Sequence, residues 1–447
     1  MTDSFDLVIR GGDCLTPSGR LQTDIGVRGG RIAALGDLTA APAAETFDAS
    51  KFAVLPGVID TQVHFREPGM AHKEDLESGT RAAALGGVTA VFEMPNTRPA
   101  TTTAEALAAK VALTKGRIWC DAAFFVGASP DNAEALAELE RLPGACGVKM
   151  FMGSSTGTLL VASDADVRRV LMGGRRRVAV HSEDEARLEE RKGIAADANS
   201  PHAHADWRDV ETALRCTQRL LKIARETARP VHVLHITTAE EMPLLAAHKD
   251  IATVEVTPQH LTLSAPDCYD RLGTLAQMNP PIRGEAHREA IWQALAEGIV
   301  DVIGSDHAPH SLEEKGHAYP NSPSGMPGVQ TLVPVMLDHV NAGRLTLERF
   351  VDLTSAGPQR LYGIAGKGRL AVGYDADFTV VDMKAKRTIE NSWIASKCGW
   401  TPFDGMKVTG WPAATIVRGA FVMREDELAS TPSGEIVRFV GLGGAPA

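Results

Sequence analysis

Residues 54–65 read VLPGVIDTQVHF, and residues 300–310 read VDVIGSDHAPH. Each is an apolar, β-branched run that ends in polar side chains, and six further runs of the same kind lie between them. They are VTAVFEMPN (88–96), CDAAFFVG (120–127), GVKMFMG (147–153), RVAVHSED (177–184), VHVLHITT (231–238) and ATVEVTPQHL (252–261). Near-continuous apolar strands are typical of a parallel sheet that is covered on both faces.

Segments rich in Ala, Leu, Arg and Glu separate these runs, as in KEDLESGTRAAALGG (73–87) and WRDVETALRCTQRLLKIARETA (207–228). Eight alternations of strand and helix over roughly 300 residues predict an α/β protein, a (β/α)8 TIM-like barrel with long loops. A doubly wound open sheet is the alternative. It is disfavoured because no GxGxxG motif follows the first run and because polar residues end nearly every strand.

The two ends of the chain differ from this middle and have a similar texture. Residues 5–37 contain short β-type runs broken by Gly pairs, and residues 367–423 repeat that pattern. Neither piece is long enough for a core of its own, so we expect one small β-sandwich built from both chain ends. The predicted organisation is sandwich over 1–53, barrel over 54–365, and sandwich plus C-terminal tail over 366–447.

Composition excludes several classes of protein. Hydrophobic residues make up 44% and charged residues 23%, which excludes a disordered chain, a collagen-like fibre and a coiled coil. The formal net charge of −10, without long runs of one sign, argues against nucleic acid as a partner. No apolar run reaches the length of a membrane span, no secretory signal is recognisable, and the six cysteines form no CxxC pair. We therefore expect a cytoplasmic protein with reduced thiols that binds no membrane.

Polar side chains end the predicted strands, at the rim where a barrel of this kind places its active site. They are Asp60, Gln62, His64 and Arg66 on the first strand, Asn96, Lys149, His181, His235 and His260 on later strands, and Asp306, His307 and His310 on the last. Imidazoles and a carboxylate that converge from several strands favour a divalent metal site. Neutral imidazole and carboxylate suit Zn²⁺, and fewer than six protein ligands leave a place for water.

Such a site predicts hydrolytic chemistry. A divalent ion lowers the pKa of bound water from about 15.7 to about 7. Asp306 is then placed to accept the proton of that water and to return it to a leaving nitrogen. Lys149 has three donors and no acceptor, so it cannot bind a cation as it stands. It can be an ion-paired core residue, a Schiff-base nucleophile, or a lysine that CO₂ converts into a carbamate able to bridge two metals.

Seven motifs, in order along nearly the whole chain, resemble those of a known family. They are PGVIDTQVHFREPG (56–69), GGVTAVFEMPNTRP (86–99), GVKMF (147–151), VHSED (180–184), LHITT (234–238), NPPIR (279–283) and IGSDHAPH (303–310). Together they resemble the cyclic amidohydrolases and, within them, the dihydroorotases. The resemblance implies a TIM-like barrel that carries a metal site for hydrolysis of a ring amide, with a composite β-sandwich made from the chain ends.

The resemblance also implies roles for individual residues. His64 matches the second histidine of the family's H-x-H pair, and Lys149 matches its carboxylated bridging lysine. His181 and His235 match the imidazole ligands of the second metal, and Asp306 matches the metal-binding acid and base. The implied cofactor is Zn²⁺, one or two ions per chain.

Arg66 bears on the substrate, because its forked guanidinium suits bidentate recognition of a carboxylate. The alternative is an ion pair with Glu67 or Asp75 in the same loop. The family resemblance places Arg66, Asn96 and His310 around a ring carboxylate, and Asn279 against the pyrimidine ring. Dihydroorotate carries such a carboxylate, whereas hydantoins and allantoin do not.

One position departs from the family pattern. Where the H-x-H motif is expected, the chain has Gln62-Val63-His64. A neutral amide oxygen is a much weaker zinc ligand than imidazole. Three outcomes follow: two metals with Gln62 coordinating weakly, one tightly held metal, or lost activity. We expect a working enzyme, because the remaining site residues are present.

Three functions are therefore considered. The first is a dihydroorotase of de novo pyrimidine biosynthesis, which interconverts dihydroorotate and N-carbamoyl-L-aspartate. The second is an allantoinase- or hydantoinase-type cyclic amidase. The third, supported only by Gln62, is a catalytically silent scaffold for aspartate carbamoyltransferase. A homodimer is expected from the family. The pair His202-x-His204 resembles metal ligands, but its polar surroundings favour a loop or the start of a helix.

Overall fold

The computed structural model of the chain describes residues 4–155 and 159–441. Eight parallel strands pair in chain order from β6 to β13. An isolated parallel bridge joins Val63 to His307, and the His64 N–H donates to the His307 carbonyl at 2.7 Å. The end of the last strand therefore meets the first strand, and the predicted (β/α)8 barrel is confirmed.

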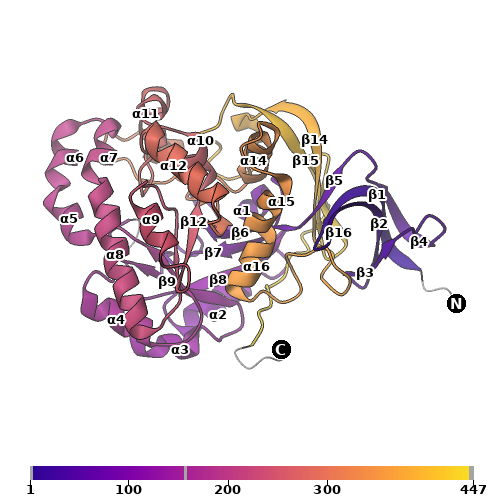
Figure 1. Cartoon of the computed structure of the whole chain (residues 1–447), viewed down its shortest axis with the longest axis horizontal. Coiled ribbons are helices and arrows are strands. Elements are labelled where there is room, and N and C mark those ends of the chain that lie inside the picture. The colour runs from indigo at the N-terminus through magenta and orange to yellow at the C-terminus, as the bar shows by residue number, and fades with distance from the viewer. Residues whose placement is uncertain (1–3, 156–158, 442–447) are drawn as a thin grey trace.

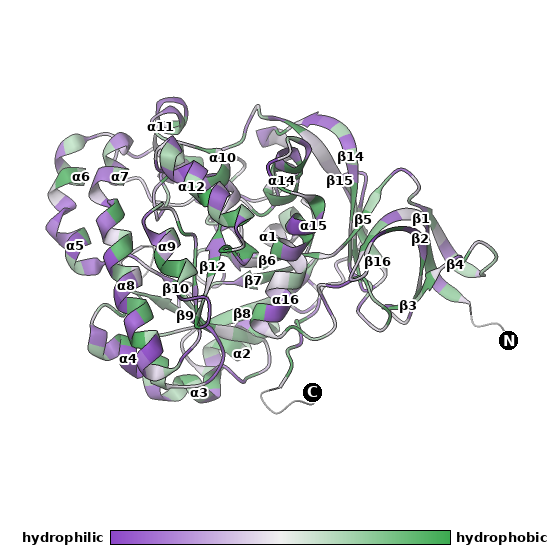
Figure 2. Cartoon of the chain, in the orientation of Figure 1, coloured by the Kyte–Doolittle hydropathy of each residue, from purple (hydrophilic) through white to green (hydrophobic). Residues whose placement is uncertain are grey.

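The barrel strands are short and fully buried, which explains their near-continuous apolar sequences. They are β6 (Val58–Val63), β7 (Val88–Glu93), β8 (Asp121–Gly127), β9 (Ala145–Phe151), β10 (Val178–His181), β11 (Val231–Val233), β12 (Ala252–Val256) and β13 (Val302–Ile303). Helices surround them, and Figure 2 shows hydrophobic residues along the strands and hydrophilic residues on the outer turns of the helices.

Helices alternate with the strands as predicted (Figure 1). Those that follow barrel strands are α1 (Leu76–Leu85), α2 (Ala104–Leu113), α3 (Leu136–Leu139), α4 (Asp164–Met172), α8 (Val210–Thr227), α9 (Glu241–Ala246), α12 (Glu285–Ala296), α14 (Leu332–Asn341), α15 (Leu347–Val351) and α16 (Gly357–Tyr362). Shorter helices lie in the loops: α5 (Glu185–Glu190), α6 (Lys192–Ala198), α7 (His204–Trp207), α10 (Pro258–Thr262), α11 (Asp267–Leu272) and α13 (Leu312–Lys315). Among the described residues, no helix is both long enough and apolar enough to cross a membrane.

Both ends of the chain form a second sheet of nine strands beside the barrel (Figure 1). Its strands are β1 (Phe5–Thr16), β2 (Gly19–Arg28), β3 (Arg31–Gly36), β4 (Ala43–Asp48), β5 (Ala53–Pro56), β14 (Phe378–Thr388), β15 (Lys407–Val417), β16 (Ala420–Arg424) and β17 (Glu427–Leu428). Strand β5 pairs with β1 on one side and with β14 on the other, so it joins the two chain ends. The sheet buries its own core, in which Ile25, Val54 and Phe378 are fully enclosed.

The stretch 54–65, expected as one strand, is divided at Gly57. Ala53–Pro56 belongs to the terminal sheet and Val58–Val63 to the barrel. Only glycine fits at position 57, because a Cβ there would collide with the side chain of Thr89. The predicted tail also returns to the barrel, since the N–H of Val437 donates to the Ala122 carbonyl at 2.9 Å.

Candidate active site

The predicted site residues gather at the carboxyl ends of the barrel strands. His181 is the last residue of β10, Gln62 is the penultimate residue of β6, Lys149 lies near the end of β9, and the others follow within loops. Nine of the ten are buried: Gln62, His64, Arg66, Asn96, Lys149, His181, His235, Asp306 and His310. Asn279 is half-buried. Their placement agrees with the prediction, and their chemical roles stay predictions.

Asp306 is the centre of the first group. Its Oδ1 accepts a hydrogen bond from Nε2 of Gln62 at 2.9 Å and lies 3.2 Å from Nε2 of His64. The other ring nitrogen of His64 lies 2.7 Å from Oδ1 of Asn96. Burial lowers the pKa of His64, so its ring is neutral at physiological pH. Oε1 of Gln62 is buried with no hydrogen-bond partner among the described residues.

His181 and His235 form the second group. Nδ1 of His181 lies 3.1 Å from Nε2 of His235, with the rings at an interplanar angle of 76°. Nε2 of His181 donates to the carboxylate of Glu183 at 2.8 Å, which leaves a lone pair on Nδ1. Burial lowers the pKa of both imidazoles. Both side chains are thus neutral, the form in which imidazole binds metal ions.

Lys149 lies between the two groups. Its positive charge lowers the pKa of His64, His181 and His235 alike, and its ammonium lies over the ring of Phe151, 4.5 Å from the centroid. Within the described part of the chain, no carboxylate is within salt-bridge distance of its Nζ. Burial lowers the pKa of Lys149 to about 7. The ion-paired alternative is therefore not what the structure contains.

Three site residues adopt left-handed backbone conformations, which side-chain-bearing residues rarely do. The φ angles are 64° at Arg66, 39° at His235 and 44° at Asp306. Each costs about 1–3 kcal/mol and persists only where the surrounding structure holds it in place. Such strain is concentrated at functional sites, which supports this rim as the site.

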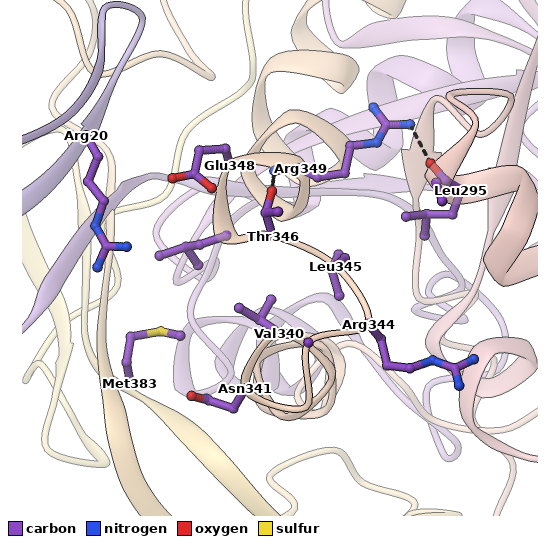
Figure 3. Close-up of a pocket in the computed structure, with 13 residues that line it drawn as sticks. Arg20, Leu295, Val340, Asn341, Arg344, Leu345, Thr346, Glu348, Arg349 and Met383 are labelled. Carbon is purple, nitrogen blue, oxygen red and sulfur yellow. Dashed lines mark hydrogen bonds between the residues drawn. The ribbon is translucent and has the colours of Figure 1, made fainter.

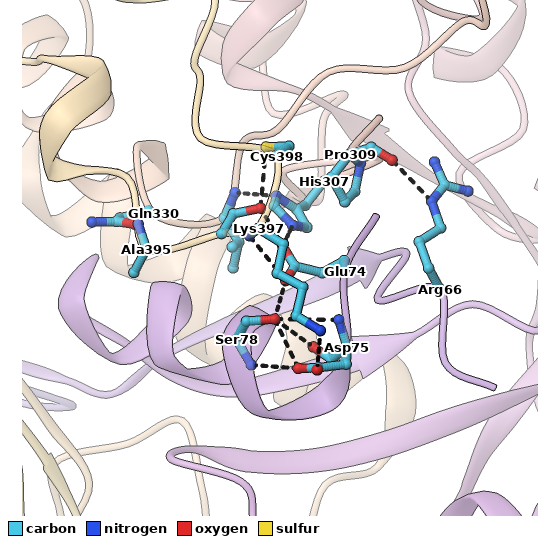
Figure 4. A network of polar contacts seen from close by, with 12 residues as sticks. Arg66, Glu74, Asp75, Ser78, His307, Pro309, Gln330, Ala395, Lys397 and Cys398 are labelled. Atoms are coloured by element: carbon cyan, nitrogen blue, oxygen red, sulfur yellow. Dashed lines mark hydrogen bonds and ion pairs between the residues drawn. The ribbon is translucent and has the colours of Figure 1, made fainter. Parts of the chain in front are cut away.

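A cavity of about 300 Å³ opens beside the first group, lined by Arg66, Asn96 and His310 together with Lys73 and Arg98. Arg66 is 2% exposed. Its Nε donates to the Pro309 carbonyl at 3.2 Å (Figure 4), and its Nη2 lies 3.2 Å from Nε2 of His310.

Neither of the expected alternative partners of Arg66 binds it. Glu67 pairs with Arg117 at 3.1 Å, and Asp75 pairs with Lys397. Among the described residues, Arg66 has no carboxylate partner, although a buried cation normally requires one. The cavity is therefore suited to an anion.

Asn279 is held by a histidine that sequence reasoning set aside. Nε2 of His204 lies 2.9 Å from Oδ1 of Asn279 and 3.0 Å from the Met278 carbonyl. His204 is fully buried at the start of α7, and burial lowers its pKa to about 3. Its position before a helix was predicted, but its contact with Asn279 was not.

The terminal sheet contributes to this rim through the connection between β14 and β15. Ser396 donates to Glu74, which also lies 3.3 Å from Nε2 of His307 (Figure 4). Nε1 of Trp400 donates to the carbonyl of His310 at 2.8 Å. The loops that carry Arg66 and His310 are therefore braced from outside the barrel.

The donor set fits a divalent cation. In the described part of the chain, no three His, Cys, Asp or Glu side chains are arranged to hold a metal ion by themselves, and the donors at this rim contact one another in pairs. Two pairs of neutral or anionic donors, with a buried lysine between them, nevertheless present nitrogen and oxygen ligands that suit Zn²⁺. The unpartnered Oε1 of Gln62 and Nδ1 of His235 are buried at the same rim.

A larger cavity, of about 860 Å³, lies between the terminal sheet and α14–α15 (Figure 3). Arg20, Met383, Arg344 and Glu348 are among its lining residues. None of the predicted reacting residues lines it. The smaller cavity is lined by Arg66, Asn96 and His310, which were predicted to bind substrate, and it is therefore the candidate substrate pocket.

A barrel with reactive side chains gathered at the carboxyl ends of its strands is the layout of a TIM-barrel enzyme. A model of the amidohydrolase family matches residues 53–422, and the chain belongs to that family. It is 38% identical to a dihydroorotase of Halobacterium salinarum, over 94% of this chain and 97% of the relative. It is 34% identical to an allantoinase of Deinococcus radiodurans, over 97% and 99%.

Among solved structures, the chain is similar to an L-hydantoinase (dihydropyrimidinase) of Arthrobacter aurescens. The TM-score is 0.92 at 30% identity, over 97% of this chain and 99% of that one. The predicted resemblance to the cyclic amidohydrolases is thereby confirmed.

Proposed function

We propose that the chain is a dihydroorotase, which hydrolyses dihydroorotate reversibly to N-carbamoyl-L-aspartate. The observation that carries the proposal is the buried guanidinium of Arg66, which has no carboxylate partner among the described residues and lines a cavity together with Asn96 and His310. A carboxylate on the substrate ring would complete this cavity, because it can accept from the guanidinium and from the side chains of Asn96 and His310. The dihydroorotases among the relatives support the same substrate.

We propose Zn²⁺ as the cofactor, held by His64, His181, His235, Asp306 and a carboxylated Lys149, with Gln62 as a weak additional ligand. When bound, the ion lowers the pKa of water and polarises the amide carbonyl. Asp306 accepts the proton at Oδ1 and returns it to the leaving ring nitrogen. Asn279, held by His204, contacts the pyrimidine ring.

The deciding experiment assays purified, zinc-supplemented protein against dihydroorotate, hydantoin and allantoin, with the metal content measured on the same sample. We expect bound zinc and turnover of dihydroorotate above the other two. Turnover of allantoin or hydantoin alone would favour the second function, which the Deinococcus radiodurans relative represents. Bound metal without turnover of any of the three would favour the scaffold.

The Arg66→Ala variant tests the carboxylate argument directly. It should raise KM for dihydroorotate strongly, whereas Arg81→Ala should not, because Arg81 pairs with Glu77 on the surface of α1, away from the cavity. Intact dihydroorotate turnover in Arg66→Ala would reject the argument.

Two partner proposals are separate from the chemistry. We propose a homodimer, which light scattering on the purified protein would test. We also propose association with aspartate carbamoyltransferase, which copurification of the two full-length proteins would test.

A further inference from the structure

The imidazole of His310 has more hydrogen-bonding neighbours than a neutral ring can satisfy, and Lys73 is one of them. Nδ1 of its ring lies 3.2 Å from Nζ of Lys73. Nε2 lies 3.2 Å from Nη2 of Arg66 and 3.1 Å from the Ser324 carbonyl. Lysine and arginine only donate, and a carbonyl only accepts. A neutral imidazole has one N–H and one lone pair, so it cannot satisfy all three neighbours.

The position of the ring proton follows from these contacts. With the proton on Nε2, Lys73 donates to Nδ1 and the ring donates to Ser324, so both bonds form. With the proton on Nδ1, that N–H faces the ammonium of Lys73, and its nearest carboxylate oxygen, on Glu314, is 3.7 Å away. Nε2 would then accept from Arg66. Lys73 therefore selects the tautomer with the proton on Nε2.

The choice of tautomer decides what the cavity presents to a carboxylate. With the proton on Nε2, His310 donates to Ser324 and accepts nothing from Arg66, so the guanidinium keeps its N–H donors for a carboxylate. With the proton on Nδ1, the Nε2 lone pair accepts from Arg66, which leaves fewer guanidinium donors for an incoming carboxylate. We propose that Lys73 is a specificity-determining residue, which acts through His310 to make the cavity select substrates that carry a ring carboxylate. This inference rests on the proposed function.

The surroundings of His310 keep its ring neutral. The charged groups that face it are Arg66, Lys73, Glu314 on α13 and, further away, Lys315. Nζ of Lys73 is also paired with Glu314 at 2.8 Å, so the ammonium is held in place. Burial and the neighbouring cations lower the pKa of His310 to about 3. The ring thus has a single proton whose position Lys73 controls.

The first test compares Lys73→Met with the wild type on dihydroorotate and on hydantoin, which lacks the carboxylate. We expect KM for dihydroorotate to rise about tenfold, equivalent to about 1.4 kcal/mol, with kcat within about twofold. KM for hydantoin should not change, and Lys73→Arg, which keeps a donor, should restore much of the loss. An equal defect on both substrates, or no defect, would overturn the inference.

Lys397→Met is the matched control. Lys397 fixes the same loop, through Asp75 and the Ala71 carbonyl, but does not contact His310. If Lys73 only braced the loop, both variants would raise KM for both substrates. Thermal unfolding of each variant separates a folding defect from a binding defect.

A double-mutant cycle provides the second test. In a His310→Gln background the side chain has no tautomer, so Lys73→Met should add little to KM for dihydroorotate. Full additivity would contradict an action through His310. If the wild type hydrolyses hydantoin but not dihydroorotate, the proposed function fails, and the inference fails with it. If dihydroorotate is hydrolysed but Lys73→Met is neutral, only the inference fails.

Discussion

The side-chain amide of Gln62 donates to Oδ1 of Asp306 at 2.9 Å, the same carboxylate oxygen that lies 3.2 Å from Nε2 of His64. A neutral amide thus stands at the position of the first histidine of the family's H-x-H pair. Oε1 of Gln62 remains buried without a partner in the described part of the chain. The proposed first metal position would therefore have one imidazole ligand from this segment in place of two.

Replacing that amide should strengthen metal binding. We expect Gln62→His to bind the first metal about 10–100-fold more tightly, because imidazole is a better zinc ligand than a neutral amide. Chelator competition on both proteins measures this. Equal metal affinity in the two proteins would contradict the prediction.

Glu183 should control the second metal position. It accepts the Nε2 proton of His181 at 2.8 Å and so directs the Nδ1 lone pair toward His235. Glu183→Gln should weaken metal binding about 10–100-fold, as measured by chelator titration. Glu190→Gln, an exposed change on α5, is the control. Glu183 also pairs with the buried Arg208, so thermal unfolding of each variant is needed to separate a loss of stability from a loss of metal binding.

Carboxylation of Lys149 should depend on pH. Only the neutral amine reacts with CO₂, and burial lowers the pKa of Lys149 to about 7. The neutral fraction falls about tenfold between pH 8 and pH 6, so uptake at fixed dissolved CO₂ should fall as the pH falls. The carbamate signal in 13C NMR reports this.

The same experiment has a matched control in Lys315, whose pKa burial also lowers to about 7. Lys315 is held by the carbonyls of Gln277 and Pro323, at 3.0 and 2.9 Å. Lys149→Met should therefore abolish the carbamate signal, while Lys315→Met should keep it. The reverse outcome would show that Lys149 is not the carboxylated residue.

His204 should position Asn279 for the substrate. His204→Ala removes the ring nitrogen that lies 2.9 Å from Oδ1 of Asn279, so we expect KM to rise several-fold with a smaller change in kcat. His202→Ala is the control, because His202 is partly exposed and pairs with Asp270 at 3.3 Å. Identical kinetics for the two variants would show that His204 has no such role.

The buried ion pair of Lys110 and Glu93 should matter for stability. Both side chains are almost fully enclosed, and burial raises the pKa of Glu93 to about 7. Lys110→Met leaves that carboxyl without its cation and should lower the free energy of unfolding by about 3–5 kcal/mol. Denaturant unfolding measures the loss, and adding Glu93→Gln should recover part of it. No recovery in the double variant would assign the loss to packing.

The barrel could be predicted because its strands are buried on both faces, which leaves a continuous apolar signal in the sequence. The break at Gly57 could not, because the apolar run continues through β5 and β6 although the two strands belong to different sheets. Pairing partners, which sequence periodicity does not contain, decide that division.

The strand-end rule located His64, His181 and Asp306, because the position of a side chain on a barrel strand fixes which rim it reaches. Lys73 and His204 lie in loops, where a charged or polar stretch resembles any solvated segment. Their contacts with His310 and Asn279 depend on how distant loops pack. Glu183 lies two residues after His181 in the sequence, but that spacing alone does not identify a carboxylate that orients a histidine.

The hydrogen bond from Nε1 of Trp400 to the His310 carbonyl has a consequence for protein engineering. A chimera that combines this barrel with the terminal sheet of another cyclic amidase would exchange the segment that supports His310. The loop after β13 and the connection between β14 and β15 form one transplantable unit. Exchanging either alone is expected to change substrate preference while leaving His64, His181 and His235 in place.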